Sequence, residues 1–333
     1  MSDAPNALYA LQPHAFDKIY GPDERTDIAR LTAIEERAYT EDELKAAPDR
    51  LADVEFLFSG WGGPCIDAAF LAAAPRLRAV FYGAGSIKHI QSDAFWEADI
   101  PIASAWGANA VPVAEYTLSQ ILFSLKRGWA HVMDGRARQA WPQRFPVAGA
   151  YGSTVGIVSL GMIGRMVCEH LRRFDVRVIA YDPFVDAAAA AELGVELVDL
   201  PTLFRDADVV SLHTPWLPET EGLITGELIA SMKEGASFLN TARGAVVRED
   251  ELCAVLAERP DLWAVLDVTY PEPPAEGSPL YTLPNVILTP HIAGSLDGEC
   301  RRMGRTMVEE CERFLRGEPL RWRVTREMFV RMA

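Results

Sequence analysis

The sequence predicts an α/β protein of two domains, the larger of which is a doubly wound parallel sheet. The chain has 333 residues, and single domains commonly hold about 100–200 residues. Between residues 154 and 288, short apolar runs typical of strands alternate with segments of helical periodicity. Such alternation is typical of a parallel sheet with helices on both faces.

The composition argues against several classes of function. Hydrophobic residues make up 49% and charged residues 24% of the chain, which is ordinary globular usage and allows a sizeable core. The formal net charge is −15. So acidic a chain is a poor candidate for binding nucleic acid, which requires neutralising phosphates, or an anionic membrane surface.

The cysteines and the N-terminus point to a reducing compartment. There are five cysteines, and no two of them have Cys-x-x-Cys spacing. Neither a disulfide framework nor a metal site is indicated. The first residues lack the basic region of a signal peptide, so we expect a cytoplasmic protein. Phe145–Gly164 carries no charge, but Pro146 and three glycines break it, so we expect a loop and a strand rather than a membrane span.

The first half of the chain gives fewer elements than the second. We leave the segment before residue 50 unassigned. Beyond it we expect strands and helices at Val54–Phe58, Ile66–Ala74, Leu77–Tyr82, Ile100–Ser104 and, as one long helix, Val113–Lys126. Gly128–Pro146 is interpreted as an irregular arm, whose Trp129 and Trp141 need a partner surface.

The second half supplies the alternating pattern. The expected strands are Val155–Ser159, Val176–Tyr181, Asp208–Leu212, Ala236–Leu239, Trp263–Val268 and Val286–Leu288. The expected helices are Met162–Phe174, Asp186–Leu193, Gly226–Met232, Arg248–Glu258 and a closing helix at Leu296–Leu315.

A glycine-rich turn between the first strand and helix of this half predicts a dinucleotide site. It reads Gly156-Ile-Val-Ser159-Leu-Gly161-Met-Ile-Gly164. Compared with the Rossmann pattern G-x-G-x-x-G, Ser159 replaces the first glycine, while Gly161 and Gly164 fill the other two places. We expect the backbone from Gly161 through Met162 and Ile163 to Gly164 to lie against a pyrophosphate at the helix N-terminus. Serine is small enough that we expect binding to survive.

The second strand of this half ends at a candidate ribose ligand. Asp182 lies eighteen residues after Gly164, near the spacing expected of an acid that accepts the ribose hydroxyls. Its carboxylate would repel a 2′-phosphate, so NAD is favoured over NADP. The alternative is a turn former before Pro183.

Four segments together resemble the D-isomer-specific 2-hydroxyacid dehydrogenase family, over roughly residues 50–320. None of the four is specific alone, but their order and spacing are. They are Gly83–Gly85 with Asn109–Glu115, Gly156–Gly164 with Asp182, Asn240–Val247, and Asp267–Pro273 followed by Thr289–Ile292.

The resemblance implies a split architecture. A Rossmann-type NAD-binding domain, residues 105–294, would be inserted into a smaller flavodoxin-like α/β substrate domain built from residues 1–104 and 295–333. The active site would lie in the cleft, and the arm Gly128–Pro146 matches the region through which such enzymes dimerise. We therefore expect a homodimer that acts on a small 2-keto or 2-hydroxy acid.

The resemblance also assigns the catalytic residues. Arg243 would clamp the substrate carboxylate and keto oxygen through two parallel hydrogen bonds. His291 would donate a proton in reduction and accept one in oxidation. Glu272 would fix the tautomer of His291 and favour its imidazolium form. Taken alone, these would be a solvated arginine, a structural histidine and a surface glutamate.

The remaining site residues follow from the same resemblance. The backbone N–H groups of Ala84 and Gly85 would hold the substrate carboxylate, and an anion nest of this kind needs small, uncharged residues. Thr241 and Ala242 would contact the cofactor, and Asp267 would hold the nicotinamide amide.

Two functions remain open from the sequence, beside a degenerate, cofactor-free protein whose only support is Ser159. The first is an NAD-dependent D-2-hydroxyacid dehydrogenase, running more often as a ketoacid reductase. The second is an NAD(H)-sensing, corepressor-like binding protein on the same fold, because such proteins can retain Arg243, Glu272 and His291.

Overall fold

The structure, a computed structural model, describes residues 4–332. They form two compact units. Unit 1 holds the described residues up to Ala110 together with Ser295–Met332, and unit 2 holds Val111–Gly294. The division falls within helix α6 (Trp106–Leu125), whereas the sequence analysis places it between residues 104 and 105. Pro112 lies inside α6 and removes one backbone donor without ending the helix.

Unit 1 contains a six-stranded sheet among the described residues, in the order β13-β5-β4-β3-β1-β2. All pairings are parallel except that of β13 with β5. The order β2-β1-β3-β4-β5 is that of flavodoxin-like sheets, as the fold class predicts. The strands are β1 (Asn6–Ala10), β2 (Ala33–Tyr39), β3 (Phe56–Ser59), β4 (Ala79–Tyr82), β5 (Ile102–Ser104) and β13 (Arg323–Val324).

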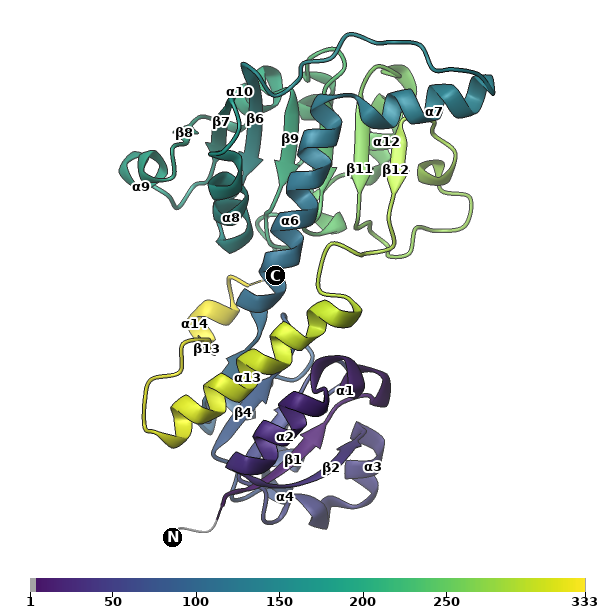
Figure 1. The fold of residues 1–333 in the computed structure, drawn as a ribbon. Coiled ribbons are helices and arrows are strands. Elements are labelled where there is room, and N and C mark those ends of the chain that lie inside the picture. The colour runs from purple at the N-terminus through teal and green to yellow at the C-terminus, as the bar shows by residue number, and fades with distance from the viewer. Residues whose placement is uncertain (1–3, 333) are drawn as a thin grey trace. The chain divides into compact units, whose positions relative to one another are not determined.

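Helices cover both faces of this sheet (Figure 1). One apolar cluster packs α1 (Pro13–Ile19), α2 (Pro22–Leu31) and α13 (Cys300–Leu315) against one face. A second cluster packs the other face against α3 (Glu41–Ala46), α4 (Ala68–Ala73), α5 (Asp93–Glu97) and α14 (Arg326–Phe329). The sheet is therefore the middle layer of three.

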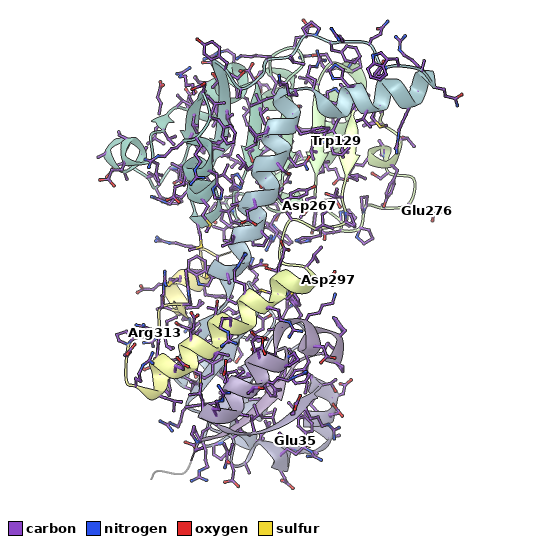
Figure 2. The ribbon with its side chains drawn as sticks, in the orientation of Figure 1. Glu35, Trp129, Asp267, Glu276, Asp297 and Arg313 are labelled. Atoms are coloured by element: carbon purple, nitrogen blue, oxygen red, sulfur yellow. The ribbon has the colours of Figure 1, made fainter. Side chains whose placement is uncertain are left out.

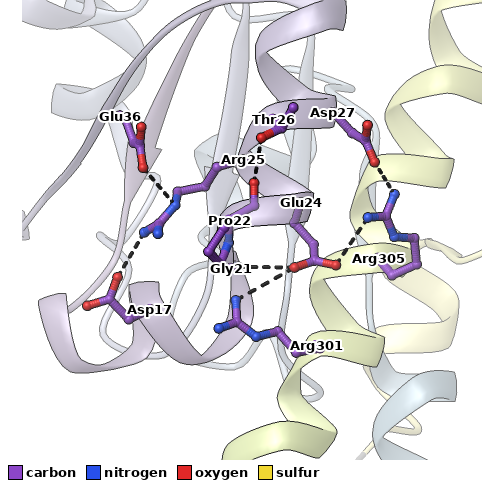
Figure 3. A network of polar contacts seen from close by, with 10 residues as sticks. All are labelled: Asp17, Gly21, Pro22, Glu24, Arg25, Thr26, Asp27, Glu36, Arg301 and Arg305. Atoms are coloured by element: carbon purple, nitrogen blue, oxygen red, sulfur yellow. Dashed lines mark hydrogen bonds and ion pairs between the residues drawn. The ribbon is translucent and has the colours of Figure 1, made fainter.

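Ion pairs join the two chain segments of unit 1, as Figure 3 shows. Arg305 on α13 binds Asp27 at 2.6 Å and Glu24 at 3.2 Å, and Arg301 lies 3.6 Å from Glu24. Glu24 is nearly buried, and a buried carboxylate needs such partners to offset its lost hydration. The hydrogen bond from Arg305 lowers the pKa of Asp27 below its ordinary value.

Unit 2 contains a seven-stranded sheet, counted over the described residues, in the order β12-β11-β10-β9-β6-β7-β8. Every pairing is parallel. The order reverses between β6 and β9, as in a doubly wound sheet. The strands are β6 (Ser153–Val158), β7 (Val176–Tyr181), β8 (Glu196–Leu197), β9 (Val209–Leu212), β10 (Ser237–Asn240), β11 (Trp263–Leu266) and β12 (Val286–Leu288).

Both faces of the second sheet are buried under helices (Figure 1). Val209 packs in the cluster that holds α6 and α8. Its neighbour Val210 packs in the cluster that holds α10, α11 and α12, because successive side chains of a strand point to opposite faces. The helices not yet given are α7 (Gly128–Arg138), α8 (Met162–Leu171), α9 (Ala187–Glu192), α10 (Leu200–Asp206), α11 (Gly226–Ala230) and α12 (Glu249–Glu258).

The arm at Gly128–Pro146 is not irregular throughout, which corrects the sequence analysis. Residues 128–138 form helix α7. Arg127 has a left-handed backbone, φ 49°, so the chain changes direction and a second helix begins. Asp134 pairs with Arg138 and accepts the backbone N–H of Gln143, which closes the turn after the helix. Trp129 packs edge-on against Phe123 of its own chain, with ring centroids 5.1 Å apart.

Besides α7, the sequence analysis missed helix α10 and the short strand β8 of unit 2, and several elements of unit 1. Helix α10 begins with Asp199 as its cap and a proline in its first turn, and both are start signals of a helix. The elements before residue 50, including the edge strand β2, were left unassigned. No helix among the described residues is long and apolar enough to cross a membrane.

Candidate functional site

The glycine-rich turn joins β6 to α8. Ser159 has φ 75°, a left-handed conformation that explains why glycine is usual at this place. The Ser159 hydroxyl lies 2.7 Å from the Thr214 hydroxyl. Ser159 therefore forms a hydrogen bond with the loop that follows β9. This hydrogen bond offsets part of the free-energy cost of the left-handed backbone.

The two glycines of the turn leave room for different reasons. A Cβ on Gly164 would lie 2.2 Å from the Ser159 carbonyl oxygen, so this glycine lets α8 pack against the turn. A Cβ on Gly161 would meet nothing within 4 Å, so the space outside the helix N-terminus is open. Free N–H groups beside open space fit a dinucleotide pyrophosphate.

Asp182 follows β7 and faces the same turn. Its Oδ2 accepts the Leu160 N–H at 2.7 Å and its Oδ1 accepts the Phe184 N–H at 2.8 Å. The carboxylate thus lies beside the glycine-rich turn, where an acid for the ribose hydroxyls is expected. Each of its oxygens retains a lone pair for a further donor.

The turns after β6 and β9 flank the point at which the strand order reverses. Ligands of open α/β sheets bind at this position. His213 follows β9, and its Nε2 lies 3.0 Å from the Ser211 hydroxyl. Burial lowers the pKa of His213 from 6.5 to about 4, so the ring is neutral at physiological pH.

The structure brings His291 and Glu272 together. His291 Nδ1 lies 2.7 Å from Glu272 Oε1. Both residues follow strands at the carboxyl edge of the sheet, β12 and β11 respectively. This arrangement directs Nδ1 at the carboxylate and leaves Nε2 as the nitrogen available to a substrate.

Arg243 follows β10 in a rigid turn. The Asn240 side chain accepts the Ala242 N–H and donates to the Arg243 carbonyl, both at 3.0 Å. Burial lowers the pKa of the Arg243 guanidinium, and the negative charge of Glu272 opposes this shift. The arginine is thus a partly desolvated cation close to the His291–Glu272 pair.

Asp267 lies at the end of β11 (Figure 2) and is almost fully buried. Its two carboxylate oxygens accept hydrogen bonds from Thr289, Ile292 and Ala293. The side chain therefore binds the loop that carries His291; its contact with a nicotinamide stays a prediction. Thr241 is buried with its hydroxyl 3.0 Å from the Thr117 hydroxyl, and Ala242 is half-buried.

In unit 1, the turn after β4 has a fixed orientation. The buried Ser104 hydroxyl contacts the carbonyl oxygens of Ala84 and Gly85. In a trans peptide the next N–H points opposite to the carbonyl, so the N–H groups of Gly85 and Ser86 point away from Ser104. The role expected of the Ala84 and Gly85 N–H groups in holding a carboxylate stays a prediction.

Sequence reasoning gave no role to Ser104, Thr289 or Tyr116. Thr289 precedes Pro290 in the Thr-Pro-His segment that carries the resemblance, so its position was a usable signal. Tyr116 offered none, because on α6 it reads only as one apolar position of the helical pattern.

Comparison with known proteins gives a consistent answer. Residues 119–293 match the model of the D-isomer specific 2-hydroxyacid dehydrogenase, NAD binding domain. The chain is 39% identical over 253 residues to (S)-sulfolactate dehydrogenase of Chromohalobacter salexigens, covering 75% of this chain and 81% of that protein. It is 35% identical over 255 residues to D-3-phosphoglycerate dehydrogenase of Mycobacterium bovis, covering 76% of this chain but 48% of that protein. The chain thus spans about half the length of the phosphoglycerate dehydrogenases that it matches.

A solved structure extends the likeness to both units. The apo D-mandelate dehydrogenase of Rhodotorula graminis superimposes with a TM-score of 0.80 at 26% identity, covering 97% of this chain and 98% of that one. The matched NAD-binding domain supports NAD as the cofactor, while the contacts of the glycine-rich turn and Asp182 with it stay predictions. The chain belongs to the D-isomer specific 2-hydroxyacid dehydrogenase family.

Proposed function

We propose that this protein is an NAD-linked oxidoreductase that interconverts a small D-2-hydroxy acid and its 2-keto acid. The 2.7 Å contact between His291 and Glu272 carries the proposal, because it prepares a histidine for proton transfer beside the half-buried cation Arg243. Two relatives support it, since phosphoglycerate and sulfolactate, the substrates in their names, are both 2-hydroxy acids.

The residues of unit 2 divide the reaction between them. When bound, NADH supplies the hydride. Arg243 holds the substrate carboxylate and keto oxygen, and so places the carbonyl carbon for attack. His291 gives its Nε2 proton to the alkoxide as negative charge develops there, while Glu272 holds the Nδ1 proton and stabilises the imidazolium. Oxidation follows the same path in reverse.

In unit 1, the turn at residues 84–86 would take part in holding the substrate carboxylate. Its support is the Ser104 hydroxyl, which directs two N–H groups away from the buried side of the turn. Small residues at Ala84 and Gly85 leave that N–H face uncovered by side chains.

The cofactor is proposed to be NADH rather than NADPH. Asp182 would accept the ribose hydroxyls with the carboxylate that already caps the glycine-rich turn. A 2′-phosphate would place a second negative charge against this carboxylate.

The chain is further proposed to act as a cytoplasmic homodimer assembled through α7 and the segment 139–151. Free cysteines throughout the described residues suit a reducing compartment.

The proposed interface carries two exposed aromatic side chains. Trp141 is 89% and Tyr151 87% exposed, and large aromatic side chains are enriched at interfaces. Light scattering on the wild type and on Trp141→Ser/Tyr151→Ser tests the assembly. A monomeric wild type overturns it.

The proposed activity is tested by NADH oxidation at 340 nm against a panel of 2-keto acids. The panel runs from glyoxylate and hydroxypyruvate through pyruvate to branched and aromatic acids, with NADPH in parallel. Turnover of at least one acid with NADH supports the proposal, and the largest acid turned over indicates the size of the substrate pocket. NADH binding with no turnover of any acid in either direction overturns it and favours the sensing function instead.

A further inference from the structure

His291 has a backbone conformation that needs support. Its φ is 54°, in the left-handed region that non-glycine residues seldom adopt. Its side chain is 49% exposed, so packing alone does not hold it. Hydrogen bonds to the neighbouring backbone must therefore determine where the ring lies.

These hydrogen bonds converge on Asp267. Its backbone oxygen accepts the His291 N–H at 3.0 Å. Its Oδ1 accepts the Ile292 N–H at 2.9 Å and its Oδ2 accepts the Ala293 N–H at 2.8 Å. Three successive N–H groups thus surround one buried residue, which shapes the loop around the left-handed position of His291.

Thr289 makes the shortest contact of the group. Its hydroxyl donates to Asp267 Oδ1 at 2.6 Å, and its carbonyl oxygen also accepts the His291 N–H at 3.0 Å. Thr289 therefore binds both the buried carboxylate and the backbone of the histidine.

Tyr116 completes the chain of contacts from helix α6. Its hydroxyl lies 3.1 Å from the Thr289 hydroxyl. The Thr289 hydroxyl has one hydrogen and donates it to the carboxylate. Tyr116 is therefore the donor in its contact with Thr289. Burial raises the pKa of Tyr116, so its hydroxyl keeps the proton it donates. The resulting line runs from Tyr116 to Thr289 to Asp267.

We propose that Thr289 and Tyr116 are positioning residues that act through Asp267 to hold His291 in contact with Glu272. The proposal rests on the acid–base role given to His291 above. Without the Thr289 hydroxyl, Oδ1 loses its shortest donor and the left-handed position loses support. The ring then leaves the orientation in which Nδ1 meets Glu272.

The test compares Thr289→Val, which removes the hydroxyl at constant shape, with Thr289→Ser, which restores it. A misplaced acid–base group costs about 10–100-fold in turnover, so Thr289→Val should lower kcat by this factor. Thr289→Ser should recover most of kcat, and Tyr116→Phe should lower it by a few-fold. Thr282→Val is the matched control, since its hydroxyl contacts only its own turn.

A second readout does not depend on activity. With ¹³C-labelled histidine, the Hε1–Cε1 signal of His291, assigned through His291→Gln, reports the surroundings of the ring. Thr289→Val should shift this signal, whereas Thr282→Val should leave it unchanged. If Thr289→Val is poorly folded by circular dichroism, Tyr116→Phe carries the same two measurements.

The outcomes separate the two proposals. Unchanged kcat and an unchanged His291 signal in Thr289→Val overturn the positioning role. Full turnover in His291→Gln overturns the proposed mechanism. In that case the His291 signal still decides whether Thr289 and Tyr116 hold the ring.

Discussion

His291 Nδ1 lies 2.7 Å from Glu272 Oε1, although the two residues are nineteen positions apart. Their side chains are 49% and 43% exposed. Ion pairs this exposed contribute little to stability. The contact is therefore better understood as orienting the histidine than as holding the fold.

Removing the charge of Glu272 should reduce catalysis and leave the fold intact. Glu272→Gln keeps an acceptor for Nδ1 but no longer stabilises the imidazolium, and His291→Gln removes the proton donor. We expect kcat to fall by about 10²–10⁴-fold in His291→Gln and less in Glu272→Gln, with unchanged NADH binding. Glu276→Gln, in the same loop (Figure 2), is the control and should behave as wild type.

Replacing the guanidinium of Arg243 by the amine of lysine should raise KM and lower kcat together. Lysine keeps the charge but cannot make two parallel hydrogen bonds to a carboxylate and a keto oxygen. Steady-state kinetics of Arg243→Lys should show kcat/KM reduced on the order of 10²-fold. The control is Arg248→Lys, which replaces an exposed arginine of the same segment and should change kcat and KM little. Equal kinetics for both variants would remove Arg243 from the site.

Asp182 should set the choice between the two nicotinamide cofactors. Asp182→Ser removes the charge that opposes a 2′-phosphate, so the preference for NADH over NADPH should fall about tenfold or more. Asp186→Ser removes a nearby acid that only caps α9 and should keep the preference. A wild-type enzyme that already favours NADPH contradicts this role for Asp182.

Alanine at the two glycines of the glycine-rich turn should impair different properties, stability at Gly164 and NADH binding at Gly161. In Gly164→Ala the new Cβ lies 2.2 Å from a backbone oxygen, and overpacking of this kind costs about 1–3 kcal/mol of unfolding free energy. Gly161→Ala meets open space and should keep its stability, but its methyl group would obstruct the pyrophosphate and weaken NADH binding. Denaturant unfolding and fluorescence titration separate the two effects.

His213 should make the protein less stable as the pH falls. Its pKa is about 4 in the folded state against an ordinary 6.5, so the unfolded chain binds a proton first. The contribution of neutral His213 to the free energy of unfolding is fully present above pH 6.5, and it is lost progressively as the pH falls toward 4. The full loss is about 3 kcal/mol. Denaturant unfolding between pH 7 and 4.5 should show a flatter dependence in His213→Gln than in the exposed control His14→Gln.

Local patterns in the sequence were sufficient where a residue's neighbours in the chain decide its structure. The expected strands at residues 176–181 and 286–288 match β7 and β12, because runs of apolar residues bounded by turns have few alternatives. Helix α7 was not recognised, since its start depends on the left-handed Arg127 and its end on the Asp134 contact with Gln143. Neither signal is part of a periodic pattern.

The sequence by itself determined the fold class and the glycine-rich turn, and its family resemblance selected Arg243, Glu272 and His291 as the candidate catalytic residues. Only the tertiary structure decided how they are held. The contact of His291 with Glu272 and the line from Tyr116 through Thr289 to Asp267 join segments far apart in the chain. Such hydrogen bonds depend on which strand ends and helices the packed core brings together, and no local spacing records that.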